Sequence, residues 1–164
     1  MTSLKDKIVF ITGASAGFGQ STAERFAREG ARLILAARRE EKLHQLAERL
    51  EVPCLVRWLD VRDRDEVNSM VAGLPVEWQA IDILVNNAGV LSLSGTLETE
   101  IKRFDLMMDI NLRGAFISSK ICIPYLKKSK NPHILNISPP LHIEAKWFSN
   151  YLAYTISKYG MSEC

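Results

Sequence analysis

The sequence predicts an α/β fold, a Rossmann-like doubly wound parallel sheet with helices on both faces. Three observations support this prediction. Short apolar runs recur along the chain, segments with helical periodicity follow them, and the first run leads into a glycine-rich turn. Because each strand–helix unit has about the length that a right-handed crossover needs, we expect the strands to lie parallel in one sheet. Ligands of such sheets bind at the carboxyl ends of the strands.

Length and composition indicate an ordinary globular chain. Its 164 residues are 47% hydrophobic and 24% charged with a net charge of +2, which predicts a single domain over 1–164. Basic and acidic residues are interspersed, so we expect no nucleic-acid partner. The first residues form no apolar signal core and no apolar run reaches membrane-spanning length, so we expect a cytoplasmic protein without a membrane partner. Cys54, Cys122 and Cys164 are widely spaced, which predicts reduced thiols and no metal site.

The first apolar run, from Ile8 to Ile11, leads into Gly13, Gly17 and Gly19. Four β-branched or aromatic residues in a row predict a central strand buried on both faces. A run rich in helix formers follows from 20 to 29. Glycines let an anion approach the main chain, and the new helix supplies a positive field, so the turn predicts a phosphate cradle. The alternative is a tight turn without a ligand, because the glycine spacing differs from the common dinucleotide fingerprint.

The second apolar run, residues 33–37, ends in Arg38 and Arg39. In a nicotinamide-binding fold the end of this strand faces the adenosine ribose, where an acid would accept hydrogen bonds from the 2′-hydroxyl. No acid occupies that place here, and a guanidinium pairs well with a 2′-phosphate, so NADP is favoured over NAD. The alternative is that both arginines only begin the solvated face of a helix over 40–50.

Two further strands follow along the chain. The third is expected over 54–59, ending at residues 60–61, and a helix with acids in its first turn should run from about 63 to 74. The fourth strand is expected over 83–85. Small and polar residues at 86–89 follow it, which places another ligand-facing segment at the carboxyl edge of the sheet.

A long helical period covers 99–127 and is interrupted by Asn111 and Gly114, and Pro124 is expected to kink or end it. A fifth strand over 133–137 leaves Ser138 at its carboxyl end. A loop and a final helical segment complete the chain.

Tyr154 and Lys158 are four residues apart in that final segment, so they share one face of a helix. A nearby ammonium favours phenolate and would lower the pKa of the tyrosine, which suits proton transfer near neutral pH. The alternative is an exposed helix face. Ser138 could hydrogen-bond a substrate carbonyl or be a turn residue, and Asn111 could hold a water or mark a bend.

Together these motifs resemble the short-chain dehydrogenase/reductase family. The resemblance covers nearly the whole chain and rests on residues 12–19, Asp60 and Val61, NNAG at 86–89, Asn111, Ser138, and Tyr154 to Lys158.

The resemblance implies roles for individual residues. Tyr154 would be the general acid/base, Lys158 would bind the nicotinamide ribose and tune the tyrosine, Ser138 would orient the carbonyl, and Asn111 would support a proton relay. Asp60 would meet the adenine. The residues expected to bind NADP(H) are Gly13, Ser15, Gly17, Phe18, Gly19, Arg38, Arg39, Asp60, Val61, Asn87, Ala88, Gly89, Tyr154 and Lys158.

The implied reaction is hydride transfer between NADPH and a small-molecule carbonyl or alcohol, in a homo-oligomer. Up to about residue 89 the amino-acid sequence is similar to that of NADP-dependent 3-hydroxy acid dehydrogenases. From residue 107 onward it is similar to that of the hydroxysteroid dehydrogenase-like protein 2 group. Because these two groups act on different substrates, the substrate class stays open. The family fold normally continues with further strands, so we expect a domain incomplete at its C-terminus. A cofactor-binding but inactive protein is therefore the alternative function.

Overall fold

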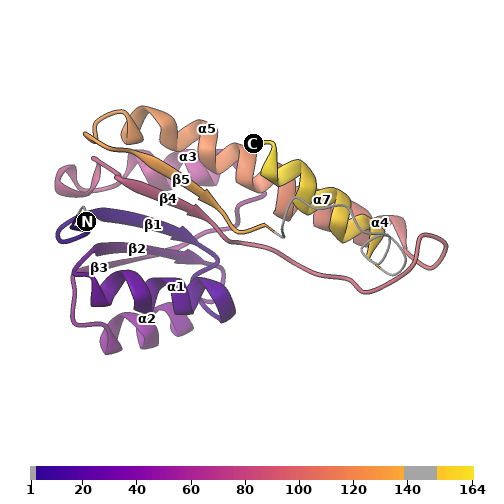
Figure 1. The fold of residues 1–164 in the computed structure, drawn as a ribbon, viewed down its shortest axis with the longest axis horizontal. Coiled ribbons are helices and arrows are strands. Elements are labelled where there is room, and N and C mark those ends of the chain that lie inside the picture. Colours follow the sequence, from indigo (N-terminus) through magenta and orange to yellow (C-terminus); the bar gives the residue numbers. More distant parts are fainter. Residues whose placement is uncertain (1–2, 139–150) are drawn as a thin grey trace.

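The computed structural model describes residues 3–138 and 151–164, and in them five parallel strands form one sheet in the order β3-β2-β1-β4-β5 (Figure 1). The strands are β1 Ile8–Thr12, β2 Arg32–Ala37, β3 Cys54–Trp58, β4 Ile83–Asn86 and β5 His133–Asn136. The predicted doubly wound parallel sheet is confirmed. The expected loop before the last helix, at 139–150, lies outside the described residues.

Helices cover both faces of this sheet, with α1 and α2 on one side and α3 and α5 on the other (Figure 1). The helical elements are α1 Gly17–Arg28, α2 Glu40–Arg49, α3 Arg64–Ala72, η1 Val76–Trp78, α4 Ile101–Met107, η2 Met108–Arg113, α5 Gly114–Leu126 and α7 Leu152–Ser162. None of the helices within 3–138 and 151–164 is both long and apolar enough to cross a membrane.

Strand β1 divides the core into two layers. Its side chains alternate, so that Val9 and Ile11 pack in the layer of α1 and α2, while Ile8 and Phe10 pack in the layer of α3 and α5. All five residues of β1 are buried. Full burial of one such side chain contributes about 1.5–3 kcal/mol to the stability of the fold. The buried side chains therefore hold the end of β1, and with it the start of the glycine turn, in place.

The long helix predicted over 99–127 is confirmed in extent but not in regularity. It consists of α4, the π-helix η2 and α5, and Asn111 lies in the π-helical part. A π-helical turn inserts an extra residue per turn and often marks a functional site. Pro124 is tolerated inside α5, which ends two residues later at Leu126.

Candidate active site

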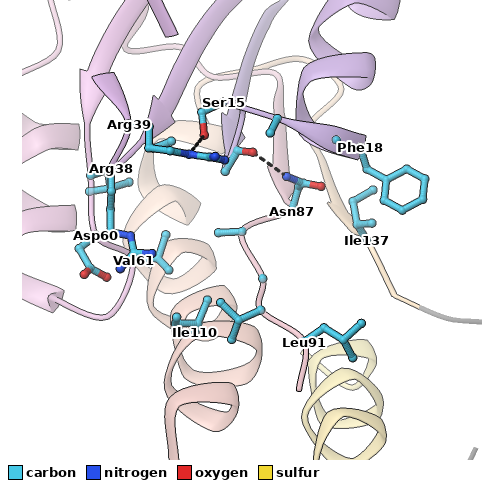
Figure 2. A pocket seen from close by; sticks show the side chains of 18 of the residues that line it. Ser15, Phe18, Arg38, Arg39, Asp60, Val61, Asn87, Leu91, Ile110 and Ile137 are labelled. Atoms are coloured by element: carbon cyan, nitrogen blue, oxygen red, sulfur yellow. Dashed lines mark hydrogen bonds between the residues drawn. The ribbon is translucent and has the colours of Figure 1, made fainter. Parts of the chain in front are cut away.

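A cavity of about 1000 Å³ lies at the carboxyl ends of the strands. A residue that follows each of the five strands lines it, namely Gly13, Arg38, Leu59, Asn87 and Ile137. Figure 2 shows these segments converging on one space from different strands. This is the edge at which doubly wound sheets bind their ligands.

The cavity gathers every predicted site residue except Gly19 and Asn111. The predicted residues that line it are Gly13, Ser15, Gly17, Phe18, Arg38, Arg39, Asp60, Val61, Asn87, Ala88, Gly89, Ser138, Tyr154 and Lys158. It also contains apolar residues that sequence reasoning did not single out: Val90, Leu91, Ile110 and Ile137. They follow β4 and β5 or lie on η2, and only the folded topology brings them together.

The glycine turn has the geometry of an anion cradle. Gly13 has a φ of +68°, and a Cβ there would lie 2.7 Å from the Cα of Ala88, so the two main chains touch. Gly17 has a φ of +57° and a Cβ there would meet nothing within 4 Å, so this residue faces open space. Ala16, the N-cap residue of α1, makes no side-chain cap hydrogen bond. The N–H groups at the start of a helix have no partner within the helix, so those of α1 can serve an anionic ligand.

Gly19 does not line the cavity and lies on α1, which begins at Gly17, three residues earlier than predicted. A Cβ at Gly19 would overlap the carbonyl oxygen of Gly13 and the side-chain amide of Asn87. That amide donates to the carbonyl oxygens of Thr12 at 3.0 Å and Gly13 at 3.1 Å. Gly19 thus lets Asn87 pack against the turn and does not itself face the ligand.

Thr12 connects the glycine turn to the segment after β4. Its hydroxyl accepts hydrogen bonds from the main-chain N–H groups of Asn87 at 3.1 Å and Ala88 at 3.2 Å, and donates to the carbonyl oxygen of Val85. The side chain is 2% exposed. Sequence reasoning gave Thr12 no role of its own; the only signal was a hydroxyl at the end of an apolar strand.

The other end of the cavity is rich in guanidinium groups. Arg38 and Arg39 are exposed, and the Nε of Arg39 donates to the hydroxyl of Ser15 at 3.2 Å (Figure 2). Arg62, which the sequence did not indicate, donates hydrogen bonds to the carboxylate of Asp60. Its Nε lies 3.0 Å from Oδ1 and 3.1 Å from Oδ2, and its Nη2 lies 2.6 Å from Oδ2. The hydrogen bond from Arg62 holds the pKa of Asp60 below its ordinary value. The one carboxylate lining this cavity among the described residues is therefore already paired.

Lys158 and Tyr154 lie on α7 and both line the cavity. Lys158 is 5% exposed, its Nζ donates to the carbonyl oxygen of Ile137 at 2.9 Å, and burial lowers its pKa to about 8. Burial also raises the pKa of the Tyr154 phenol. The expected lowering of this pKa by the ammonium is wrong, because burial raises it and the Lys158 ammonium donates to the carbonyl oxygen of Ile137, the residue after β5.

Asn111 is fully buried and joins two segments. Its Oδ1 accepts from the N–H of Val90 at 2.8 Å, and its Nδ2 donates to the carbonyl oxygen of Val90 and to the hydroxyl of Ser157, both at 2.9 Å. A Cβ at Gly89 would lie 3.3 Å from both Asn111 Oδ1 and Lys158 Nζ. Asn111 Oδ1 and Lys158 Nζ thus both lie close to the position that a side chain at Gly89 would take, and the relay role stays a prediction.

Ser138 lines the cavity, but its hydroxyl is directed at α7. It donates to the carbonyl oxygen of Lys158 at 3.0 Å and contacts the hydroxyl of Ser162. The carbonyl-orienting role expected for Ser138 stays a prediction, and it would require this hydroxyl to change partners.

The three cysteines are free thiols in this fold. Burial raises the pKa of Cys54 to about 11 and that of Cys122 to about 12, and it also raises the pKa of Cys164. Raised thiol pKa values disfavour the nucleophilic thiolate.

Comparison with known proteins identifies a consistent set of relatives. The sequence model of the family described as "short chain dehydrogenase" matches residues 7–164. Hydroxysteroid dehydrogenase-like protein 2 of Danio rerio is 47% identical over 169 aligned residues, which cover 95% of this chain and 40% of the relative. The chain thus spans about two-fifths of the length of this relative.

Solved structures resemble this fold over nearly all of the chain. The structure of a short chain dehydrogenase from Mycobacterium thermoresistibile has a TM-score of 0.89 and 38% identity, covering 99% of this chain and 61% of that chain. The closed form of serine dehydrogenase complexed with NADP+ has a TM-score of 0.87 and 33% identity, covering 95% and 62%. The similarities to hydroxysteroid dehydrogenase-like protein 2 and to serine dehydrogenase each cover 95% of this chain, so neither is confined to one half of it.

Proposed function

Because this chain belongs to the short-chain dehydrogenase family, we propose that it is an oxidoreductase that transfers a hydride between NADP(H) and a carbonyl or secondary alcohol. One observation carries the proposal. The glycine cradle, the exposed guanidiniums of Arg38 and Arg39, and the Tyr154–Lys158 pair all open into the same cavity. When bound, the dinucleotide supplies the hydride, and the residues of the chain bind it and move the proton.

The residues present fit a dinucleotide diphosphate. The open space at Gly17 and the uncapped start of α1 offer main-chain N–H groups to it. Arg38 and Arg39 are exposed at the end of β2, where a 2′-phosphate would pair with a guanidinium. The carboxylate of Asp60 is held by Arg62, so it is a poor acceptor for ribose hydroxyls. That the similar serine dehydrogenase structure contains NADP+ supports the choice of cofactor.

The pKa directions fit Tyr154 as a proton donor in carbonyl reduction. A raised pKa keeps the phenol protonated at neutral pH, so the phenol can protonate the developing alkoxide. With a pKa of about 8, Lys158 is mostly an ammonium at pH 7. Two of its three protons are donated, to the carbonyl oxygen of Ile137 at 2.9 Å and to the sulfur of Met161 at 3.5 Å, which leaves one donor for a ribose hydroxyl.

Replacing Tyr154 with Phe tests the catalytic proposal, because it removes the proton and little volume. We expect carbonyl reduction to fall by about a hundredfold or more while the NADPH dissociation constant stays within about twofold. Tyr125→Phe is the matched control, since Tyr125 lies on α5 and does not line the cavity. Unchanged turnover in Tyr154→Phe would refute the mechanism. Wild-type protein that binds NADPH and reduces no carbonyl would favour the alternative of an inactive cofactor-binding protein.

Replacing Arg38 with Asp tests the cofactor choice. A guanidinium–phosphate pair contributes on the order of 1.5–3 kcal/mol, or about ten- to a hundredfold in affinity, so the preference should shift toward NAD by at least that factor. Calorimetric titration with both cofactors measures it. Arg103→Asp is the control, because Arg103 is exposed on α4 and does not line the cavity. An Arg38→Asp protein that keeps its preference for NADP would contradict the assignment.

The same carbonyl-reduction assay tests the substrate class. The similar proteins are named as a serine dehydrogenase and as hydroxysteroid dehydrogenase-like protein 2, so the panel should contain 3-oxo derivatives of small hydroxy acids and lipid-like ketones. The expected homo-oligomer and the cytoplasmic location stay predictions.

A further inference from the structure

Three consecutive residues at the end of β5 each contact α7. The side-chain amide of Asn136 donates to the carbonyl oxygen of Met161 at 3.1 Å. The carbonyl oxygen of Ile137 accepts from Lys158 Nζ at 2.9 Å. The hydroxyl of Ser138 donates to the carbonyl oxygen of Lys158 at 3.0 Å. All three contacts fall within the last two turns of α7, and we call this group the β5–α7 clamp.

The clamp is anchored in the sheet. The Oδ1 of Asn136 accepts from Asn86 Nδ2 at 2.8 Å, and the same Nδ2 donates to the hydroxyl of Ser119 on α5 at 2.9 Å. Asn86 is 1% exposed and is the register partner of Asn136 in the β4–β5 pair. The Asn86 Nδ2 group is buried with two hydrogen-bond partners, and it resists displacement because a lost partner would leave a desolvated donor. The position of α7 is thus tied to the strand that precedes Asn87.

The proton of the Ser138 hydroxyl is used within this group. Ser138 and Ser162 contact each other through their hydroxyls, and each can donate to the carbonyl oxygen of Lys158, at 3.0 and 3.1 Å. A hydroxyl has one proton to donate. In either arrangement the Ser138 proton points to Lys158 or Ser162, and a substrate carbonyl would need that same proton.

We propose that Ser138 is a positioning residue, which with Asn136 sets the place of the Lys158 ammonium in the cavity, and not a ligand of the substrate carbonyl. The inference rests on the proposed function for what Lys158 and Tyr154 do. A small slide of α7 along β5 would move the ammonium away from Gly89, where a Cβ would lie only 3.3 Å from Nζ. Proton transfer and ribose binding need both groups within hydrogen-bond reach of their partners.

The test compares Ser138→Ala with Ser162→Ala, since Ser162 does not line the cavity but shares the same hydrogen bonds. Hydrogen exchange of the α7 amides in the protein without cofactor should speed up by about three- to tenfold in each variant. In the double variant the α7 amides should exchange only a little faster than in the single variants, because both hydroxyls donate to the same carbonyl oxygen. The dissociation constant for NADPH should rise about three- to tenfold in both variants, and Ser138→Thr, which keeps the hydroxyl, should restore the wild-type values.

A carbonyl ligand would behave differently. Ser138→Ala alone would then lower kcat for ketone reduction, while α7 exchange and the behaviour of Ser162→Ala would match the wild type, and that result overturns the proposal. If Ser138→Ala does not fold, as judged by near-UV circular dichroism, Ser162→Ala decides alone. The exchange measurement needs no turnover, so failure of the proposed enzymatic function and failure of this inference are distinguishable.

Discussion

Strands β1 and β5 support the two halves of the cavity in different ways. Every residue of β1 is buried, whereas Ile134 and Leu135 of β5 are 40% and 42% exposed. After β1 the turn is shaped by main-chain contacts too close for a methyl group. After β5, three single hydrogen bonds from side chains and main chain join the end of the strand to α7, which also packs against α4 and η2 and accepts a hydrogen bond from Asn111 at Ser157. The turn after β1 is thus determined by steric exclusion and the contact between β5 and α7 by directional bonds, so substitutions should give abrupt losses in the first and graded losses in the second.

Gly13→Ala should produce the largest loss, because both the positive φ and the 2.7 Å approach to Ala88 Cα oppose a methyl group. The left-handed conformation costs about 1–2 kcal/mol and the overlap about 1–3 more, so we expect the free energy of unfolding to fall by roughly 2–5 kcal/mol. Gly17→Ala is the matched control, with a similar φ but open space around its Cβ.

Denaturant unfolding gives the free energy of unfolding of the Gly13→Ala and Gly17→Ala variants. We expect Gly17→Ala to lose only about 1–2 kcal/mol, which is the cost of the backbone conformation alone. Equal losses in the two variants would show that the close approach at Gly13 contributes nothing.

Local and long-range features of the site differed in how far the sequence revealed them. The strands were predictable because β-branched runs such as Ile8 to Ile11 are buried on both faces, and the cradle because only glycine tolerates its backbone. The spacing of Tyr154 and Lys158 correctly placed both on one helix. It could not reveal the direction of the ammonium, since Ile137 reaches it only through the tertiary fold.

The direction of the Tyr154 pKa shift and the β5–α7 clamp could not be predicted from the sequence, because both depend on the tertiary fold. Desolvation depends on what covers a group, and burial therefore raised a pKa that a neighbouring charge was expected to lower. Asn136 and Asn86 are fifty positions apart, and their hydrogen bond follows from strand register. No sequence pattern within either segment predicts this hydrogen bond.

Lys158→Met should remove a pH dependence of about 2–3 kcal/mol. Burial lowers the pKa of Lys158 from 10.5 to about 8, so between these pH values the unfolded chain holds a proton that the folded chain has lost. The free energy of unfolding from this group therefore rises as pH rises from about 8 to 10.5, and below pH 8 the burial cost is present in full.

The difference between wild type and Lys158→Met isolates this effect. The raised pKa values of Tyr154 and the cysteines act in the opposite direction, and they cancel in the difference. Urea unfolding of both proteins at pH 7, 8.5 and 10 gives the curve. A difference that stays flat across this range would mean that the ammonium is solvated, and the catalytic half would then be more open than its 5% exposure indicates.

The smallest effect is expected at the edge of the sheet, where Val85 and Leu135 are register partners on β4 and β5. Val85 is fully buried, so Val85→Thr places a hydroxyl in the core and should cost about 2 kcal/mol. Leu135 is 42% exposed and Thr suits a strand, so Leu135→Thr should cost about 1 kcal/mol or less. Urea unfolding of the 164-residue chain compares the two variants directly. If both variants lose the same stability, the surface of β5 is covered in solution, and the contrast between a buried β1 and a half-exposed β5 no longer explains why the two ends of the cavity are built differently.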